Sequence, residues 1–92
     1  MARVSVEIPH RLSRDEARNR ILSATPRLEK EYSANCHWDG EMRLIVSRKG
    51  LKAALDVEDT RVLVAIDLSF FLGPFGSSIR AGIVNQLTGL LA

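Results

Sequence analysis

Three groups of residues have side chains that could take part in catalysis or metal binding. They are the adjacent Cys36 and His37, the two histidines of the chain considered together, and a group of acidic residues. Cys36 and His37 are neighbours, and a thiol beside an imidazole is the pairing that activates a cysteine nucleophile. They fall in a segment with the period of a β-strand, where adjacent side chains project to opposite faces, so the pair cannot share a proton. We therefore expect Cys36 or Trp38 to pack inward and His37 to face solvent.

The two histidines, His10 and His37, could in principle hold a zinc ion together with a carboxylate. They lie far apart in the sequence and form no ligand pair at the short spacings that build a zinc site. His10 follows Pro9 at an expected junction between strand and helix, where capping or turn structure is the better interpretation. We predict no metal and no cofactor.

The acidic candidates are Asp56, Glu58 and Asp59, which cluster at an expected strand end, and Asp67. General acid catalysis would require one of them to be buried with a perturbed pKa. Asp56 and Asp67 each alternate with apolar neighbours and therefore point outward. The chain also has no glycine-rich phosphate loop and no serine elbow, so we predict no catalytic residues and no enzyme.

The length and the charge of the chain limit which classes of protein it can belong to. A chain of 92 residues has room for one domain, residues 1–92, with a thin core. Its 13 basic and 11 acidic residues give a net charge of +2 and are interleaved, which does not favour nucleic-acid binding. One cysteine, Cys36, fits a reducing compartment. Without a signal peptide or an apolar run of roughly 18 residues, we expect a cytoplasmic protein with no transmembrane segment.

The first part of the chain predicts a strand and a helix. Residues 4–8 alternate between apolar and polar, and Pro9 stops the strand. Ser13 and Glu16 form a capping box at the start of the helix. Pro26 allows two outcomes, a kinked helix or a second short helix capped by Thr25. We favour one kinked, nearly continuous helix, because its apolar stripe keeps its phase: Ala17, Ile21, Ala24, Leu28 and Tyr32.

The rest of the chain changes to a period of two and then returns to a helical period. Turn signals cut it into strands over residues 35–38, 42–47, 51–57 and 61–68. The last strand is apolar on both faces, so it is central or its outer face is covered. Ser77 or Ser78 should cap a final helix. Its apolar stripe is Ile79, Ile83, Leu87 and Leu90, widened by Val84 and Leu91.

The element order is therefore strand, helix, four strands, helix. It predicts an α+β fold, β-α-β-β-β-β-α, with a curved five-stranded antiparallel sheet and two helices on one face. This arrangement is similar to a shortened helix-grip module, the architecture of small lipid-binding domains. That similarity concerns the fold and specifies no ligand.

All three phenylalanines lie in the connection before the last helix. Phe70, Phe71, Leu72 and Phe75 either seal the end of the core or leave a ring for an apolar partner. The Gly73-Pro74 pair should prevent regular structure there. Because adjacent side chains in extended backbone face opposite ways, we expect Phe70 and Leu72 inside, Phe71 exposed, and Phe75 second in exposure.

The sequence resembles the bacterial polyhydroxyalkanoic acid system proteins nearly from end to end. The residues that carry the resemblance are Ile8-Pro9-His10, Trp38-Asp39-Gly40, Leu68 to Leu72 and Pro74-Phe75. Genes of this family tend to lie beside polyester-granule genes, so the resemblance implies an association with polyhydroxyalkanoate metabolism and no defined catalytic residues. Relatives commonly carry Gly at the position of Ser69 and Lys at that of Gly76.

Three functional hypotheses follow. The first is a non-catalytic accessory protein, cytoplasmic or granule-associated, that binds a granule surface, a hydrophobic acyl chain or a granule protein through Phe70, Phe71, Leu72 and Phe75. The second is a homodimeric interaction module without a small ligand, which uses Leu63 and Ala65 or the flank of the last helix around Val84 and Leu91. The third, ranked last, is a small enzyme that uses His10 and an acid.

Overall fold

The computed structural model describes residues 2–69 and 72–92 of the chain. The order of elements is the predicted one, with a 3-10 turn added before the last helix. The elements are β1 (Ala2–Pro9), α1 (Arg14–Tyr32), β2 (Asn35–Trp38), β3 (Arg43–Arg48), β4 (Leu51–Val57), β5 (Arg61–Leu68), η1 (Gly73–Phe75) and α2 (Gly76–Leu91).

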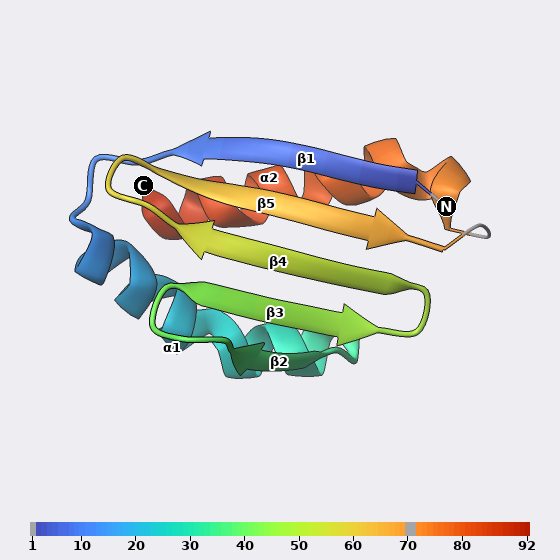
Figure 1. Ribbon diagram of the computed structural model, residues 1–92, viewed down its shortest axis with the longest axis horizontal. Coiled ribbons are helices and arrows are strands. Elements are labelled where there is room, and N and C mark those ends of the chain that lie inside the picture. Colours follow the sequence, from blue (N-terminus) through green and yellow to red (C-terminus); the bar gives the residue numbers. More distant parts are fainter. Residues whose placement is uncertain (1, 70–71) are drawn as a thin grey trace.

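The five strands form one antiparallel sheet in the order β1-β5-β4-β3-β2 (Figure 1). The last four strands are a meander, because each pairs with the next along the chain. β1 returns to pair with β5 along its whole length, from Ala2 opposite Leu68 to Pro9 opposite Arg61. β5 is thus flanked on both sides, which confirms the prediction that its apolar pattern marks an inner strand.

Helix α1 runs through Pro26 without a break, which confirms one nearly continuous helix over a second short helix capped by Thr25; the expected kink stays a prediction. Its N-cap is Ser13, whose hydroxyl accepts the Glu16 N–H at 3.1 Å. Only this half of the capping box forms, since the Glu16 carboxylate instead accepts from Arg20. Pro26 leaves the Leu22 carbonyl without its helical donor, and both residues are exposed, so water can satisfy that oxygen.

The start of α2 corrects two expectations. Gly73, Pro74 and Phe75 form a 3-10 turn, so the Gly-Pro pair does not prevent regular structure; proline suits the first turn, where no N–H is needed. The turn leads directly into α2, which begins at Gly76 after Phe75. Neither Ser77 nor Ser78 is therefore the N-cap, and both lie inside the first turn of the helix.

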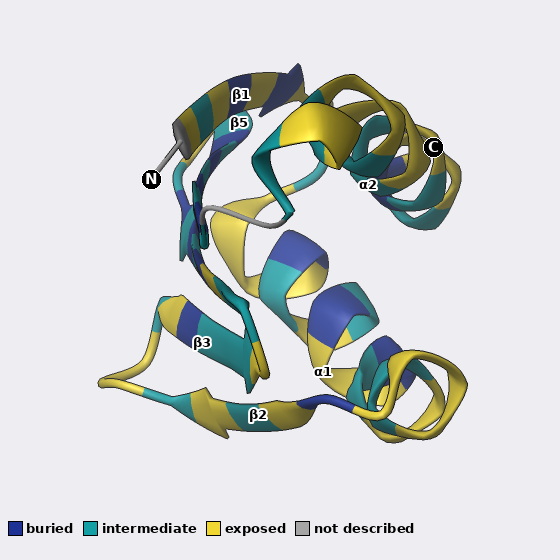
Figure 2. Cartoon of the chain, turned by 90° about the vertical axis from the view of Figure 1, so that its right-hand side faces the viewer, coloured by how far each residue is buried: buried dark blue, intermediate teal, exposed yellow. Residues whose placement is uncertain are grey.

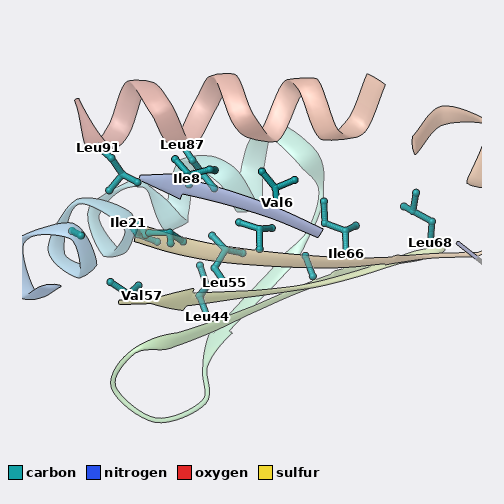
Figure 3. Close-up of a cluster of buried hydrophobic side chains, with 14 residues drawn as sticks. Val6, Ile8, Ile21, Leu44, Leu55, Val57, Ile66, Leu68, Leu87 and Leu91 are labelled. Atoms are coloured by element: carbon teal, nitrogen blue, oxygen red, sulfur yellow. The ribbon is translucent and has the colours of Figure 1, made fainter. Parts of the chain in front are cut away.

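Both helices pack on the same face of the sheet, and the sheet curves around them (Figure 2). The core lies between these layers and takes side chains from the inward faces of the strands, from α1 and from α2 (Figure 3). Ile21, Leu44, Ile66 and Leu68 are fully buried there. In α2 the buried residues are Leu87, from the expected stripe, and Leu91, which was expected to widen it; Leu90 is half-buried against the core.

The opposite face of the sheet carries polar and charged side chains around a small apolar centre. Ile45, Ala54 and Ala65 lie side by side across three strands and are half-buried. Leu63 lies beside this row, between Glu7 on β1 and Asp56 on β4. The outward orientation of Leu63 and Ala65 was expected from the alternation in β5.

Candidate functional site

The cysteine and histidine pair does not form a catalytic dyad. Cys36 and Trp38 are half-buried and pack against the core, whereas His37 between them is exposed on the other face, as predicted. Burial, followed by the nearby charge of Glu29, raises the pKa of the Cys36 thiol. A raised thiol pKa lowers the thiolate fraction, which is the opposite of what a nucleophile needs.

His10 is buried and has a structural role. Its Nδ1 accepts the Leu12 N–H at 3.2 Å, so the neutral ring carries its proton on Nε2, which lies 2.9 Å from the Glu58 carbonyl oxygen. The ring therefore joins the β1–α1 connection to the β4–β5 turn, as the capping interpretation anticipated. We call this end of the sheet, with His10, Leu12, Glu58 and Arg61, the His10 end.

The acidic candidates are paired with arginines and are at least one-third exposed. Asp56 accepts from the Arg43 Nε at 2.6 Å, and this hydrogen bond raises the pKa of the Arg43 guanidinium. Asp67, Glu58 and Asp59 have partners of their own, which are Arg3, Arg61 and Arg14 respectively. Among the described residues, no group of three or more His, Cys, Asp or Glu side chains could hold a metal ion.

The hydrophobic candidates are only partly described. Phe70 and Phe71 lie outside the described residues, and Leu72 is half-buried against the core. Phe75 is 57% exposed, the most exposed of the large hydrophobic residues in the part of the chain that the structure covers. The structure therefore places an aromatic ring of the predicted run at the surface.

This ring lies at the end of the sheet where β1 begins and β5 ends. A methyl group on Gly76, the next residue, would lie 3.6 Å from Leu68 Cδ1 and 3.7 Å from Val4 Cγ2. The turn η1 has no charged residue, and α2 has a single one, Arg80. We call this region, with Leu72, Phe75 and Gly76, the Phe75 end.

A shallow furrow runs between the two helices, and the sequence did not predict it. Its two adjoining hollows have volumes of about 540 and 370 Å³ and share Gly89 and Leu90. The remaining lining residues are polar: Glu16, Asn19, Arg20, Ser23, Arg27, Glu31, Asn85 and Gln86. Gly89, which leaves α2 without a side chain there, was the one available signal. The hollows are open to solvent, and an apolar ligand prefers a more enclosed site.

The Trp38-Asp39-Gly40 turn docks α1 onto the sheet. Arg18 of α1 lies over the Trp38 ring, 5.0 Å from its centroid, in a cation–π contact. The Asp39 N–H donates to the Arg43 carbonyl at 2.8 Å, and Gly40 has a φ of +80°, which glycine adopts without strain. The Trp38 Nε1 is buried and has no hydrogen-bond partner among the described residues.

The fold and the site define a small α+β domain with an exposed aromatic end and without an assembled catalytic group among the residues described. The family model described as "Putative polyhydroxyalkanoic acid system protein" matches residues 4–91, and the chain belongs to this family. No curated protein and no solved structure matches the chain. None of the described helices is long and apolar enough to span a membrane.

Proposed function

We propose that this protein is a non-catalytic accessory protein of polyhydroxyalkanoate metabolism that attaches to an apolar surface through the Phe75 end. The surface is the polyester of the granule or the apolar patch of a granule protein, in the cytoplasm. The observation that carries the proposal is the 57% exposure of Phe75 in a family associated with the polyhydroxyalkanoic acid system.

The surroundings of Phe75 support an apolar partner. An exposed aromatic ring gains free energy when it leaves water, by roughly 25 cal/mol for each Å² buried. No acidic residue lies in η1 or in α2, so a partner meets few charges that must lose water when it binds. Leu72 lies half-buried beside the ring and can add to the contact.

An external surface fits better than an acyl chain held inside the fold. The space between the sheet and the helices is occupied by core side chains, among them Leu44, Ile66 and Leu68 (Figure 3). The hollows between α1 and α2 lie elsewhere, and neither is lined by Leu72 or Phe75. The partner is therefore expected to meet the ring from outside.

The test is sedimentation of the purified protein with isolated polyhydroxyalkanoate granules and with protein-free polyester particles. Phe75→Ser should reduce the bound fraction severalfold. Leu22→Ser is the matched control, because Leu22 is also an exposed large apolar residue, 41% accessible, but lies on α1. Phe71→Ser extends the test to the ring that was predicted from the sequence to be the most exposed.

The two particle types separate the two surfaces. Binding to both indicates direct contact with the polymer, and binding to granules alone indicates a granule protein as partner. Equal losses for Phe75→Ser and Leu22→Ser would show unspecific adsorption and contradict the proposal, as would the absence of binding to either particle.

A further inference from the structure

The outer edge of β1 is long, regular and unpaired within the described residues. β1 is the first strand in the sheet order and pairs only with β5, over eight residues and without a bulge. Soluble proteins usually protect such an edge with lysine, proline, a bulge or a very short strand. β1 has no lysine, its charged residues Arg3 and Glu7 are each held in an ion pair within the chain, and its proline is the last residue; β2, at the opposite edge, has only four residues.

The register shows which backbone groups point to this edge. The His10 N–H donates to the Thr60 carbonyl at 2.9 Å, which continues the β1–β5 ladder by one pair. Hydrogen-bonded pairs alternate in an antiparallel ladder, so the even-numbered residues of β1 bond to β5. The N–H and C=O groups of Arg3, Ser5 and Glu7 therefore point to the free edge. Pro9 is also odd-numbered, so its C=O points there too, but it has no N–H to donate.

We propose that this edge pairs with the same edge of a second copy of this chain, antiparallel about Ser5. In that register Arg3 lies opposite Glu7 of the second copy, Glu7 lies opposite its Arg3, and Ser5 lies opposite Ser5. Each of these pairs can exchange two backbone hydrogen bonds, because the groups that face the edge are those of Arg3, Ser5 and Glu7. A five-stranded sheet becomes a continuous ten-stranded one.

Charge complementarity selects this register. In each copy Arg3 is paired with Asp67 at 3.0 Å and Glu7 with Arg61 at 3.0 Å. Pairing about Ser5 joins these into one row of alternating sign across the interface: Asp67, Arg3, then Glu7 and Arg61 of the second copy. Opposite charges across neighbouring strands stabilise a pair, and like charges destabilise it.

Other registers lose this complementarity. A shift by two residues places Arg3 or Glu7 opposite Ser5, and in one direction it also places Pro9 opposite Arg3, where a donor is missing. A shift by four residues places arginine opposite arginine or glutamate opposite glutamate. Pairing about Ser5 also keeps the apolar side chains together, with Val4 opposite Val6 on the inward face.

The neighbouring helix is compatible with a second copy. α2 lies behind β1 and β5, whereas α1 lies behind the other side of the sheet (Figure 1). The flank of α2 that faces α1 carries Gln86 and Leu90. By helical geometry the opposite flank, toward the free edge, carries the small or medium-sized Ser77, Ala81, Val84 and Thr88, together with the exposed Arg80 at its border. The proposal does not depend on the granule role.

The test is the molar mass in solution by sedimentation equilibrium, with Arg3→Glu and Glu7→Arg studied separately and mixed. The wild-type mass should be twice 10.2 kDa at micromolar concentration. Each variant alone places like charges opposite each other and should weaken the dimer at least about tenfold. An equimolar mixture should restore it, because positions 3 and 7 are then both acidic in one chain and both basic in the chain that it faces.

Two further variants complete the design. Lys30→Glu makes the same charge change on the exposed surface of α1, away from the edge, and should leave the dimer intact. Ser5→Pro removes a central outward N–H and should give a monomer; its circular dichroism spectrum verifies that it folds. A monomeric wild type, a dimer that survives in both single charge variants, or a mixture that stays monomeric would each overturn the proposal.

Discussion

The His10 end and the Phe75 end of the sheet close the hydrophobic core with different interactions. At the His10 end, one buried imidazole bonds to two loops, and Arg61 bonds to Glu7 at 3.0 Å and to Glu58 at 2.8 Å. The polar side chains of His10, Glu58 and Arg61 are paired within the chain, whereas Trp38 Nε1, at the end of β2, is buried without a hydrogen-bond partner among the described residues. This end is closed by directed bonds.

Leu72 and Phe75 have no polar side-chain atoms, so the directed bonds of the Phe75 end are backbone hydrogen bonds, such as that from the Ser69 N–H to the Gly50 carbonyl at 2.8 Å. The Ser69 hydroxyl is buried without a hydrogen-bond partner among the described residues, and α2 begins without a side-chain cap. Its closure relies on a 3-10 turn and on apolar contacts such as those of Leu72. Because apolar contacts are not directional, a surface outside the protein can replace them. The end suited to an apolar partner is therefore the one closed mainly by apolar contacts, which an outside surface can replace.

The strongest test of this comparison is His10→Ala. It leaves the Leu12 N–H and the Glu58 carbonyl without partners and opens a small cavity, so unfolding free energy should fall by about 2 to 4 kcal/mol. Urea denaturation followed by circular dichroism measures the change. His37→Ala removes an exposed histidine and should leave stability nearly unchanged. Equal losses in both variants would show that His10 has no special role.

The opposite change is expected at the Phe75 end, where Gly76→Ala should raise stability by about 0.5 to 1 kcal/mol. Alanine favours the helix, and the new methyl group would meet Leu68 and Val4 at ordinary contact distance. Gly82→Ala is the control, since its methyl group would touch nothing within 4 Å. Thermal melting compares the two. A loss of stability in Gly76→Ala alone would mean that this end is already tightly packed.

Much of the fold followed from local patterns. The bounds of β2, β4 and β5 were predicted as observed, because alternation of apolar residues and the turns at Gly40 and Gly50 define them locally. The partner of β1 required more, since pairing with β5 joins residues more than fifty positions apart. Only the two-sided apolar pattern of β5 indicated that it had a neighbour on each side.

The site was less predictable for a physical reason. Exposure of a ring depends on how the turn meets the helix, and proline in a 3-10 turn was not recognised from the sequence. Phe75 was expected to be the second most exposed ring, and the structure shows it at the surface; Phe71, ranked first, lies outside the described residues. The furrow between α1 and α2 arises from tertiary packing and left almost no local signal.

Phe75→Ser sharpens the comparison by separating stability from binding. Because more than half of this side chain is already in water, the unfolding free energy should change by less than about 1 kcal/mol. Binding to polyester particles should nevertheless weaken. Urea denaturation and sedimentation with particles are measured on the same preparation. A loss of several kcal/mol would assign the ring to the core and remove the contrast between the two ends.

The smallest expected effect concerns Cys36, which lies in the inward row that crosses the sheet to Val4 beside the Phe75 end. Burial, then Glu29, raises the pKa of this thiol in the folded protein. The unfolded chain therefore loses its proton first as pH rises, so stability is retained at neutral pH and declines above about pH 9.

Cys36→Ala should remove this decline, and denaturation at pH 7 and pH 10 measures it. Glu29→Gln keeps an oxygen for the Cys36 N–H but removes the charge, so thiol labelling of the folded protein should become faster. Labelling of the wild type at the rate of a free thiol would instead show that this row opens readily. In that case the weak closure of the core would include the whole inward row from Val4 to Cys36 and would not be limited to the residues around Phe75.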